Sequence, residues 1–542
     1  MFTFFQCYMP ETWEAQEKAG LINKNSGIRF LQSIDVPADK KFNVLARKGG
    51  TLYEIIKERQ LPFYIDRLQG GDFFEGYDYD MDLVDEYRRL LGDKFFGFQM
   101  HEWMSNVISD IKKLTDNGCP EPWTVENIKE TIFKAFPYQH LFLEAMNAEE
   151  MAAMGHIVRL DDYLEEMRSL FARRMAYTGD MLLPCDSAYQ APELEFKAGV
   201  KRVMPEVGAQ TRDSRIQIAY ARGSAKGFGR SFGVYYEPWG GSPFSSCCYH
   251  REGKNEWNIG NENFPFKTAG DNGGSSRSLQ NRIFLYAYFA GASFLSEEWG
   301  MCNTFYDWND FELTPYGKIK LDFIRFTEKY PDIGDIITPA AVVLPEDMTV
   351  LDNFDENTEN YLSFPVTGDR AAHLKEIRKT LREIFVDSGK MLGTETVNMR
   401  NYTVADAVDI VNENCFRPEE YKYLIDLTGD AAFARAHSNI VKSGELKELL
   451  KKELPCEVDG DIHTMVSRRA DGTCFLMMLN NSGVERTVEK GEILLREADT
   501  TVTVSIRSGA ELKMLEGSAM LEADGGKYHV TIPAGGWFFG AF

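Results

Sequence analysis

Several short apolar runs in the first 330 residues end in acidic side chains, and tryptophans stand beside some of them. Glu102 closes the stretch QMHEW at 99–103, and Glu237 closes the stretch VYYEPW at 234–239. One carboxylate can stabilise an oxocarbenium-like transition state, while a second carboxyl group protonates the leaving oxygen of a glycosidic bond. The sequence therefore predicts Glu102 and Glu237 as a catalytic carboxylate pair for glycoside cleavage.

Further polar and aromatic residues end the same apolar runs and are predicted to hold the substrate. They are His101, Asp66, Arg67, Asp186, Glu206, Tyr235, Trp239, Glu297, Glu298 and Trp299. Glu297 and Glu298 are neighbours, so only one of them can point inward from an extended strand.

Other roles stay open for several of these residues. Glu206 could tune Glu237, or act as the base if the enzyme inverts the anomeric carbon. Asp66 and Arg67 could form a structural ion pair instead. Any of the tryptophans at the strand ends, Trp103 included, could pack in the core rather than stack on a sugar.

The elements that would position these residues alternate between apolar runs and amphipathic stretches, which is typical of parallel strands with crossover helices. Helices are expected at 82–92, 213–226, 275–290 and 314–330. Eight strands are expected, at 2–9, 27–36, 61–70, 95–103, 180–189, 202–210, 231–239 and 293–300. Because no GxGxxG motif opens a helix, a closed (β/α)8 TIM barrel is favoured over an open doubly wound sheet. Barrel enzymes carry their active sites at the carboxyl ends of the strands, where the candidate residues lie.

Three domains are expected. The barrel spans 1–332 and carries a largely helical insertion at about 104–179. A small flavodoxin-like α/β domain follows at 333–455, with apolar strands at 338–344 and 421–427 and a helix at 373–385. Short alternating strands with glycine and asparagine turns at 456–542 predict a β-sandwich.

The glutamates at the ends of the fourth and seventh strands resemble those of the large clan of retaining β/α-barrel glycosidases. The domain order is similar to that of the family 42 β-galactosidases within that clan. The resemblance implies that Glu102 is the acid/base, that Glu237 is the nucleophile and that Trp299 lines the sugar site. It also implies a homo-oligomer built through the middle domain. His101 stands where the clan usually has an asparagine that contacts the sugar 2-hydroxyl.

Composition excludes some classes of partner. The formal net charge of −23 disfavours nucleic acids and anionic membranes. No apolar stretch reaches the ~20 residues of a membrane span. The first residues lack the features of a signal peptide, and the nine cysteines are scattered, so a cytoplasmic location is expected. No CxxC or HExxH motif occurs, so neither a metal nor another cofactor is expected, and the expected partner is a carbohydrate.

Two alternatives to a two-carboxylate glycosidase remain. Acidic residues at the rim could hold Mg²⁺ or Mn²⁺ for an isomerase, aldolase or lyase reaction. The chain could also be a sugar-binding protein without catalysis. A polar and aromatic loop at 249–266, with Trp257 and Asn261, is expected to influence substrate choice, whereas Cys247 and Cys248 are expected to have no catalytic role.

Overall fold

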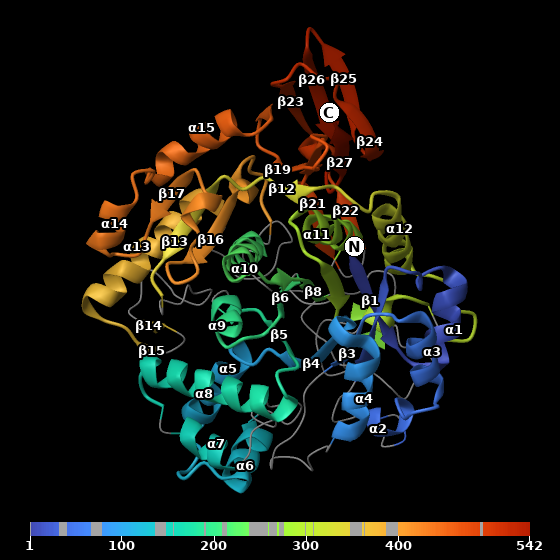
Figure 1. Cartoon of the computed structure of the whole chain (residues 1–542), viewed down its shortest axis with the longest axis vertical. Coiled ribbons are helices and arrows are strands. Elements are labelled where there is room, and N and C mark those ends of the chain that lie inside the picture. Colours follow the sequence, from blue (N-terminus) through green and yellow to red (C-terminus); the bar gives the residue numbers. More distant parts are fainter. Residues whose placement is uncertain are drawn as a thin grey trace.

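A computed structural model provides the structure of the chain (Figure 1). It describes residues 2–31, 39, 41–66, 79–135, 148–155, 157–188, 191–208, 214–237, 258–259, 268–269, 276–298, 300–306, 308–346, 360–361, 364–385, 399–487 and 491–542.

Within these residues, eight parallel barrel strands, which we call staves, pair in a closed ring, so the predicted barrel is confirmed. The staves are β1 (Thr3–Tyr8), β2 (Ser26–Leu31), β3 (Phe63–Asp66), β4 (Phe95–His101), β5 (Leu182–Asp186), β6 (Arg202–Gly208), β7 (Ser231–Phe232) continued by β8 (Val234–Glu237), and β11 (Phe294–Glu297). Each overlaps one of the eight predicted strands. Ring closure comes from the pairing of β5 with β6, and β1 pairs with both β2 and β11.

The seventh stave is split because its chain comes very close to the eighth. Gly233 stands between β7 and β8, and its N–H donates to the carbonyl of Val203 at 2.8 Å. A Cβ atom on Gly233 would come within 2.3 Å of the ring of Phe294. Glycine is therefore required at this point for the last two staves to meet.

Helices follow the staves and cover the barrel. They are α1 (Pro10–Ala19), α2 (Phe42–Leu45), α3 (Thr51–Arg59), α4 (Met81–Leu91), α9 (Ala191–Lys197), α10 (Ser214–Phe228), α11 (Arg277–Phe289) and α12 (Pro315–Lys329). Helix α12 begins with Thr314 as N-cap, whose hydroxyl accepts from the N–H of Gly317, and has proline in its first turn.

The predicted insertion between the fourth and fifth staves is helical where the structure describes it. It contains α5 (Ser105–Asp116), α6 (Val125–Ala135), α7 (Ala148–Met154) and α8 (Leu160–Thr178). In Figure 1 these teal helices lie at one end of the molecule, and the red C-terminal strands lie at the other.

The chain after the barrel forms a small α/β unit. Its sheet has three parallel strands in the described residues, with β13 (Ala340–Leu344) between β16 (Val408–Asn412) and β17 (Tyr423–Asp426). The helices beside it are α13 (Gly368–Phe385), α14 (Ala431–Ala436) and α15 (Ser443–Glu453). Helix α10 of the barrel packs so closely on this sheet that a Cβ atom on Gly223 would lie 2.1 Å from the carbonyl oxygen of Ile410.

The last part of the chain forms two antiparallel sheets that share one apolar core, as a sandwich requires. One sheet contains β12 (Asp335–Ile336), β19 (His463–Arg468), β20 (Cys474–Leu479), β27 (Trp537–Ala541) and β24 (Lys513–Gly517). The other contains β18 (Cys456–Asp459), β23 (Thr500–Ile506), β26 (Lys527–Ile532) and β25 (Met520–Asp524). Strand β12 precedes the α/β unit in sequence yet pairs with β19, so the C-terminal sheet includes a strand from the end of the barrel region.

None of the helices in the described ranges is long and apolar enough to cross a bilayer.

Candidate functional site

The carboxyl ends of four staves bring acidic side chains and one histidine together. Glu206 lies within β6, Glu237 ends β8 and Glu298 directly follows β11. His101 ends β4, and Glu102 comes next in the chain. Because alternate residues of a strand share a face, Met204 and Glu206 both point into the barrel, as do Tyr235 and Glu237. We call these four glutamates and His101 the rim cluster.

The distances within the rim cluster are short. One carboxylate oxygen each from Glu206, Glu237 and Glu298 lies within 4.8 Å of the other two. The Nε2 atom of His101 lies 3.2 Å from Glu102 and 3.4 Å from Glu298. Close packing of the staves permits this, since a Cβ atom on Gly208 would lie only 2.6 Å from the Cβ atom of Glu237.

Glu206 is the most deeply buried member of the rim cluster, with 1% of its surface exposed. No N–H group or hydroxyl of the described residues donates a hydrogen bond to either of its carboxylate oxygens. Its pKa is raised well above the usual range, first by burial and then by the negative charges of Glu102, Glu298 and Glu237. A contact with the Glu102 carboxyl group raises it further, because only a shared proton makes such a contact favourable. Burial and the neighbouring carboxylates therefore favour the protonated form of Glu206.

A buried polar network lies beneath the rim cluster. Arg29 of β2 donates to Asp66 at 2.6 Å and to the Tyr235 hydroxyl at 2.8 Å. The Tyr64 hydroxyl lies 2.6 Å from that of Ser296. Asp66, predicted to bind substrate or to pair with Arg67, forms an ion pair with Arg29 and has 0% exposure. Arg29 was not predicted from the sequence, although a charged residue inside the apolar run 27–36 was a signal for it.

The two neighbouring glutamates at the end of the eighth stave point in opposite directions, as alternation requires. Glu298 joins the rim cluster. Glu297 instead pairs with the buried Lys320 of helix α12, with Nζ 2.8 Å from Oε2. The structure thus brings Glu298, and not Glu297, to the predicted site.

Asp186 and Trp103 support the backbone beside Glu102. Asp186 accepts hydrogen bonds from the N–H groups of Met104 at 2.6 Å and Ala188 at 2.9 Å. The indole of Trp103 is 3% exposed and donates to Glu195 at 2.8 Å. Trp103 therefore packs in the core, which was one of the two roles left open for it.

Three predicted residues, Arg67, Trp239 and Trp299, lie outside the described residues. The same holds for Cys247 and Cys248 and for the loop positions Trp257 and Asn261.

Among the residues that the structure describes, two sets of side chains at the rim could hold a metal ion. They are Glu206 with Glu237 and Glu298, and Glu206 with His101 and Cys185. Three carboxylate oxygens suit a hard cation such as Mg²⁺, Mn²⁺ or Ca²⁺. Cys185 suits such ions less, and its thiol stays neutral because burial raises its pKa well above the usual range. The all-carboxylate set is therefore the better candidate for a metal.

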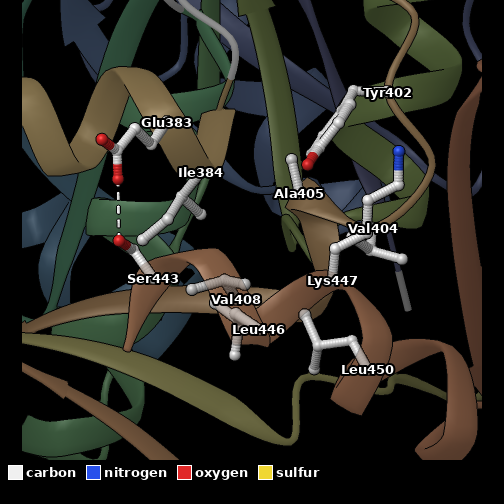
Figure 2. A pocket seen from close by; sticks show the side chains of 10 residues that line it. All are labelled: Glu383, Ile384, Tyr402, Val404, Ala405, Val408, Ser443, Leu446, Lys447 and Leu450. Atoms are coloured by element: carbon white, nitrogen blue, oxygen red, sulfur yellow. Dashed lines mark hydrogen bonds between the residues drawn. The ribbon is translucent and has the colours of Figure 1, made fainter. Parts of the chain in front are cut away.

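A shallow pocket lies far from the rim, in the α/β unit between α13 and α15 (Figure 2). Its floor is apolar and includes Val408 and Leu450. Glu383 is the one acidic residue among the ten that line it, and it accepts a hydrogen bond from Ser443 at 2.7 Å. This pocket lacks the paired carboxyl groups of the rim.

No family model and no curated protein matches the chain. Among solved structures, the chain is similar to the catalytic module of a family 98 glycoside hydrolase from Streptococcus pneumoniae in complex with the Lewis Y pentasaccharide blood group antigen. The identity is 9% and the TM-score 0.48, covering 100% of this chain and 98% of that one. For a β-galactosidase from the Antarctic haloarchaeon Halorubrum lacusprofundi, the identity is 11% and the TM-score 0.41, covering 99% of this chain and 98% of that one. For a family 30 xylanase from Clostridium acetobutylicum, the identity is 6% and the TM-score 0.31, covering 100% of this chain and 95% of that one. Likeness at this level is too distant to transfer a function, so the chemistry has to follow from the side chains.

Proposed function

We propose that the chain is a glycoside hydrolase that cleaves a glycosidic bond in an oligosaccharide or glycan with rim carboxyl groups. The observation that carries this proposal is the clustering of Glu206, Glu237 and Glu298 at the carboxyl ends of the barrel staves, with oxygens within 4.8 Å of one another and with Glu102 beside them on His101. Glycoside cleavage needs one protonated and one ionised carboxyl group at the same bond. Burial and mutual repulsion, which raise the pKa of Glu206, favour such a division of protons among these carboxyl groups.

In the proposed mechanism Glu102 is the acid/base and Glu237 the nucleophile of a retaining reaction. Glu102 gives its proton to the leaving oxygen while the Glu237 carboxylate attacks the anomeric carbon, forming a glycosyl–enzyme ester. Water then attacks the same carbon, Glu102 takes the proton of that water, and the ester bond to Glu237 breaks. The side chain of Glu102 is 21% exposed, compared with 1% for Glu206 as a whole residue, which favours Glu102 as the group that meets the substrate.

Other residues take supporting roles in this proposal. Glu298 and His101 form hydrogen bonds with sugar hydroxyls. Tyr235 and Asp66 form the rigid floor of the site. Arg67, Trp239 and Trp299 remain proposed substrate contacts. A relationship to the family 42 β-galactosidases is also part of this proposal. A homo-oligomer and a cytoplasmic location are proposed with them, and native mass spectrometry and cell fractionation would test both.

A second function is favoured by one specific observation, the three carboxylate oxygens of Glu206, Glu237 and Glu298 within 4.8 Å of one another. Such a set could bind a divalent cation for an isomerase or lyase reaction. The two functions differ in their response to a chelator.

The decisive experiment is a screen of wild type and Glu237→Gln against aryl glycosides and natural glycans, with and without EDTA. We expect EDTA-resistant sugar release by wild type and a loss of at least about 10³-fold in Glu237→Gln. Azide should rescue Glu237→Gly and give a glycosyl azide of inverted anomeric configuration, which would identify the nucleophile.

Circular dichroism and glycan binding of Glu237→Gln serve as controls, since the isosteric change should leave both intact. Sugar release that survives Glu237→Gln would remove Glu237 from the mechanism. Activity that EDTA abolishes and Mg²⁺ or Mn²⁺ restores would favour the metal-dependent function. Binding of a glycan without any turnover would favour a sugar-binding protein.

A further inference from the structure

Glu102 has a backbone conformation that side chains rarely adopt. Its φ is +45°, in the left-handed region, although it is neither glycine nor at a helix end. The Cβ atom makes this region unfavourable, so surrounding contacts must hold the residue there. Residues with such strain occur often at functional sites, and the contacts that impose it are therefore of interest.

Four hydrogen bonds hold the three residues from Glu102 to Met104. The N–H of Glu102 donates to the carbonyl of Cys185 at 2.6 Å, and the N–H of Met104 donates to the Asp186 carboxylate at 2.6 Å. The Trp103 indole donates to Glu195 at 2.8 Å. The hydroxyl of Tyr163 donates to the carbonyl of Met104 at 2.7 Å.

The partners in these bonds come from separate, well-packed elements. Cys185 and Asp186 end β5, Glu195 lies in α9, and Tyr163 lies in α8 of the insertion. Asp186, Glu195 and Tyr163 have exposures of 3%, 2% and 0%. The barrel thus fixes one side of the segment, and the inserted helices fix the other.

The hydrogen bond from Trp103 offsets part of the free-energy cost of burying the carboxyl group of Glu195. The pKa of Glu195 is raised to about 8, because burial, together with the nearby charge of Asp186, outweighs the opposing effect of the hydrogen bond from Trp103. The Trp103 ring also packs on Phe171 of α8, with ring centroids 4.9 Å apart. Trp103 is therefore held at its ring face and at its nitrogen.

We propose that Glu195, Asp186, Tyr163 and Trp103 form a positioning clamp that keeps Glu102 in its left-handed conformation, so that its carboxyl group faces the scissile bond. The inference rests on the proposed role of Glu102 as acid/base. It gives the insertion a function, because α8 supplies both Tyr163 and Phe171 to the clamp. These residues do not touch the substrate and act through Glu102.

If the clamp is disrupted, the resulting loss of kcat/KM should depend on the leaving group of the substrate. Acid catalysis matters for a poor leaving group and little for an activated one, since a good leaving group departs without a proton. Trp103→Phe and Glu195→Leu should lower kcat/KM for a phenyl glycoside about 10- to 100-fold. The same variants should change kcat/KM for the matching dinitrophenyl glycoside less than about threefold.

Two further variants serve as controls. Glu195→Gln keeps an oxygen that accepts from the Trp103 indole and should retain near-wild-type activity on both substrates. Glu193→Leu alters another buried glutamate of α9, which accepts from Asn414 of the α/β unit at 2.6 Å. It should affect both substrates by the same factor.

Crystal structures of Trp103→Phe and Glu195→Leu provide a readout that needs no activity. We expect φ at Glu102 to leave the left-handed region in both variants. An unchanged φ, or equal losses on both substrates in the folded variants, would overturn the clamp. If wild type cleaves no glycoside, the proposed function fails, and the φ of Glu102 in the variants still decides whether the clamp exists.

Discussion

At the scale of single residues, the rim cluster is governed by the repulsion between buried carboxylates. Glu102, Glu206, Glu237 and Glu298 come from four different staves, and Glu206 responds to the charges of the other three. Repulsion between buried like charges favours the retention of a proton within the cluster. Such retention is what a general acid requires, and it depends on Glu206 although Glu206 itself is sealed from solvent.

Glu206→Gln should therefore shift the pH dependence of catalysis. The substitution removes the negative charge that Glu206 can carry, so the pKa of the acid falls. The basic limb of the kcat/KM profile should therefore move about one pH unit lower. Activity at pH 7 should fall about tenfold while activity near pH 5 is largely kept. Initial rates on a phenyl glycoside between about pH 4 and about pH 9 would measure this shift.

The acidic limb of the same profile is the internal control, because it reports the ionised nucleophile and should stay in place. A basic limb that does not move would show that the proton is held without Glu206.

At the scale of elements, the junction of β11 and α12 shows how strand alternation assigns different roles to adjacent residues. Glu298 faces the rim cluster, and Glu297 faces helix α12. Lys320 binds Glu297 and also donates to the carbonyl of Gly300 and the side chain of Asn303, each at 2.6 Å. This one ammonium group ties the eighth stave, the turn after it and the following helix together.

Lys320→Met should therefore destabilise the fold. It leaves Glu297 buried without its counter-ion, and breaking a buried pair in this way costs about 3–5 kcal/mol. Urea or guanidinium unfolding followed by far-UV circular dichroism would measure the free energy of unfolding.

Lys318→Met on the exposed side of the same helix is the matched control and should change stability by less than about 0.5 kcal/mol. Equal effects of the two substitutions would mean that the Glu297–Lys320 pair contributes little.

At the scale of the whole molecule, Asp406 links the barrel, the α/β unit and the C-terminal sheets. It lies in the short helical turn Ala405–Ala407 that precedes β16, and it pairs with Arg215 of α10, with the Tyr286 hydroxyl of α11 at 2.6 Å and with His463 of β19 at 2.7 Å. All four residues are buried. The pKa of Asp406 is far below its usual range because Arg215 and His463 outweigh the effect of burial. The three parts of the chain thus share one ionic contact and should unfold together.

His463 makes this contact sensitive to acid. Burial, with the charge of Arg215, lowers its pKa to about 4 from 6.5, although Asp406 acts in the opposite direction. Below pH 6.5 the unfolded chain binds a proton at this histidine and the folded chain does not, so the folded state loses stability as the pH falls toward 4. The loss should reach about 2 kcal/mol between about pH 6.5 and about pH 5.

Chemical unfolding at several pH values would measure this loss, and His463→Gln should have a flatter pH dependence in the same interval. His529→Gln is the control, because the side chain of His529 is 41% exposed. A wild-type stability that is constant from pH 6.5 to pH 5 would contradict the assignment of His463 as a buried neutral group.

The sequence by itself determined the barrel and the ends of its staves. Periods of two and of 3.6 residues are local properties, so runs such as 95–103 and 231–239 predicted β4 and β8 without knowledge of their neighbours. The strand ends placed Glu102, Glu206, Glu237 and Glu298 at one rim for the same reason. The strand β16 was not predicted, because it is a short run whose identity depends on pairing with β13.

Only the tertiary structure decided which of these side chains meet. Asp66 pairs with Arg29 on the neighbouring stave, and Trp103 turns toward Glu195, which lies 92 positions further along the chain. Distances between side chains on different staves depend on how the strands are staggered when the barrel closes, and no local pattern encodes that stagger. The residue types were readable from the chain, whereas their distances, burial and charge coupling arise from closure.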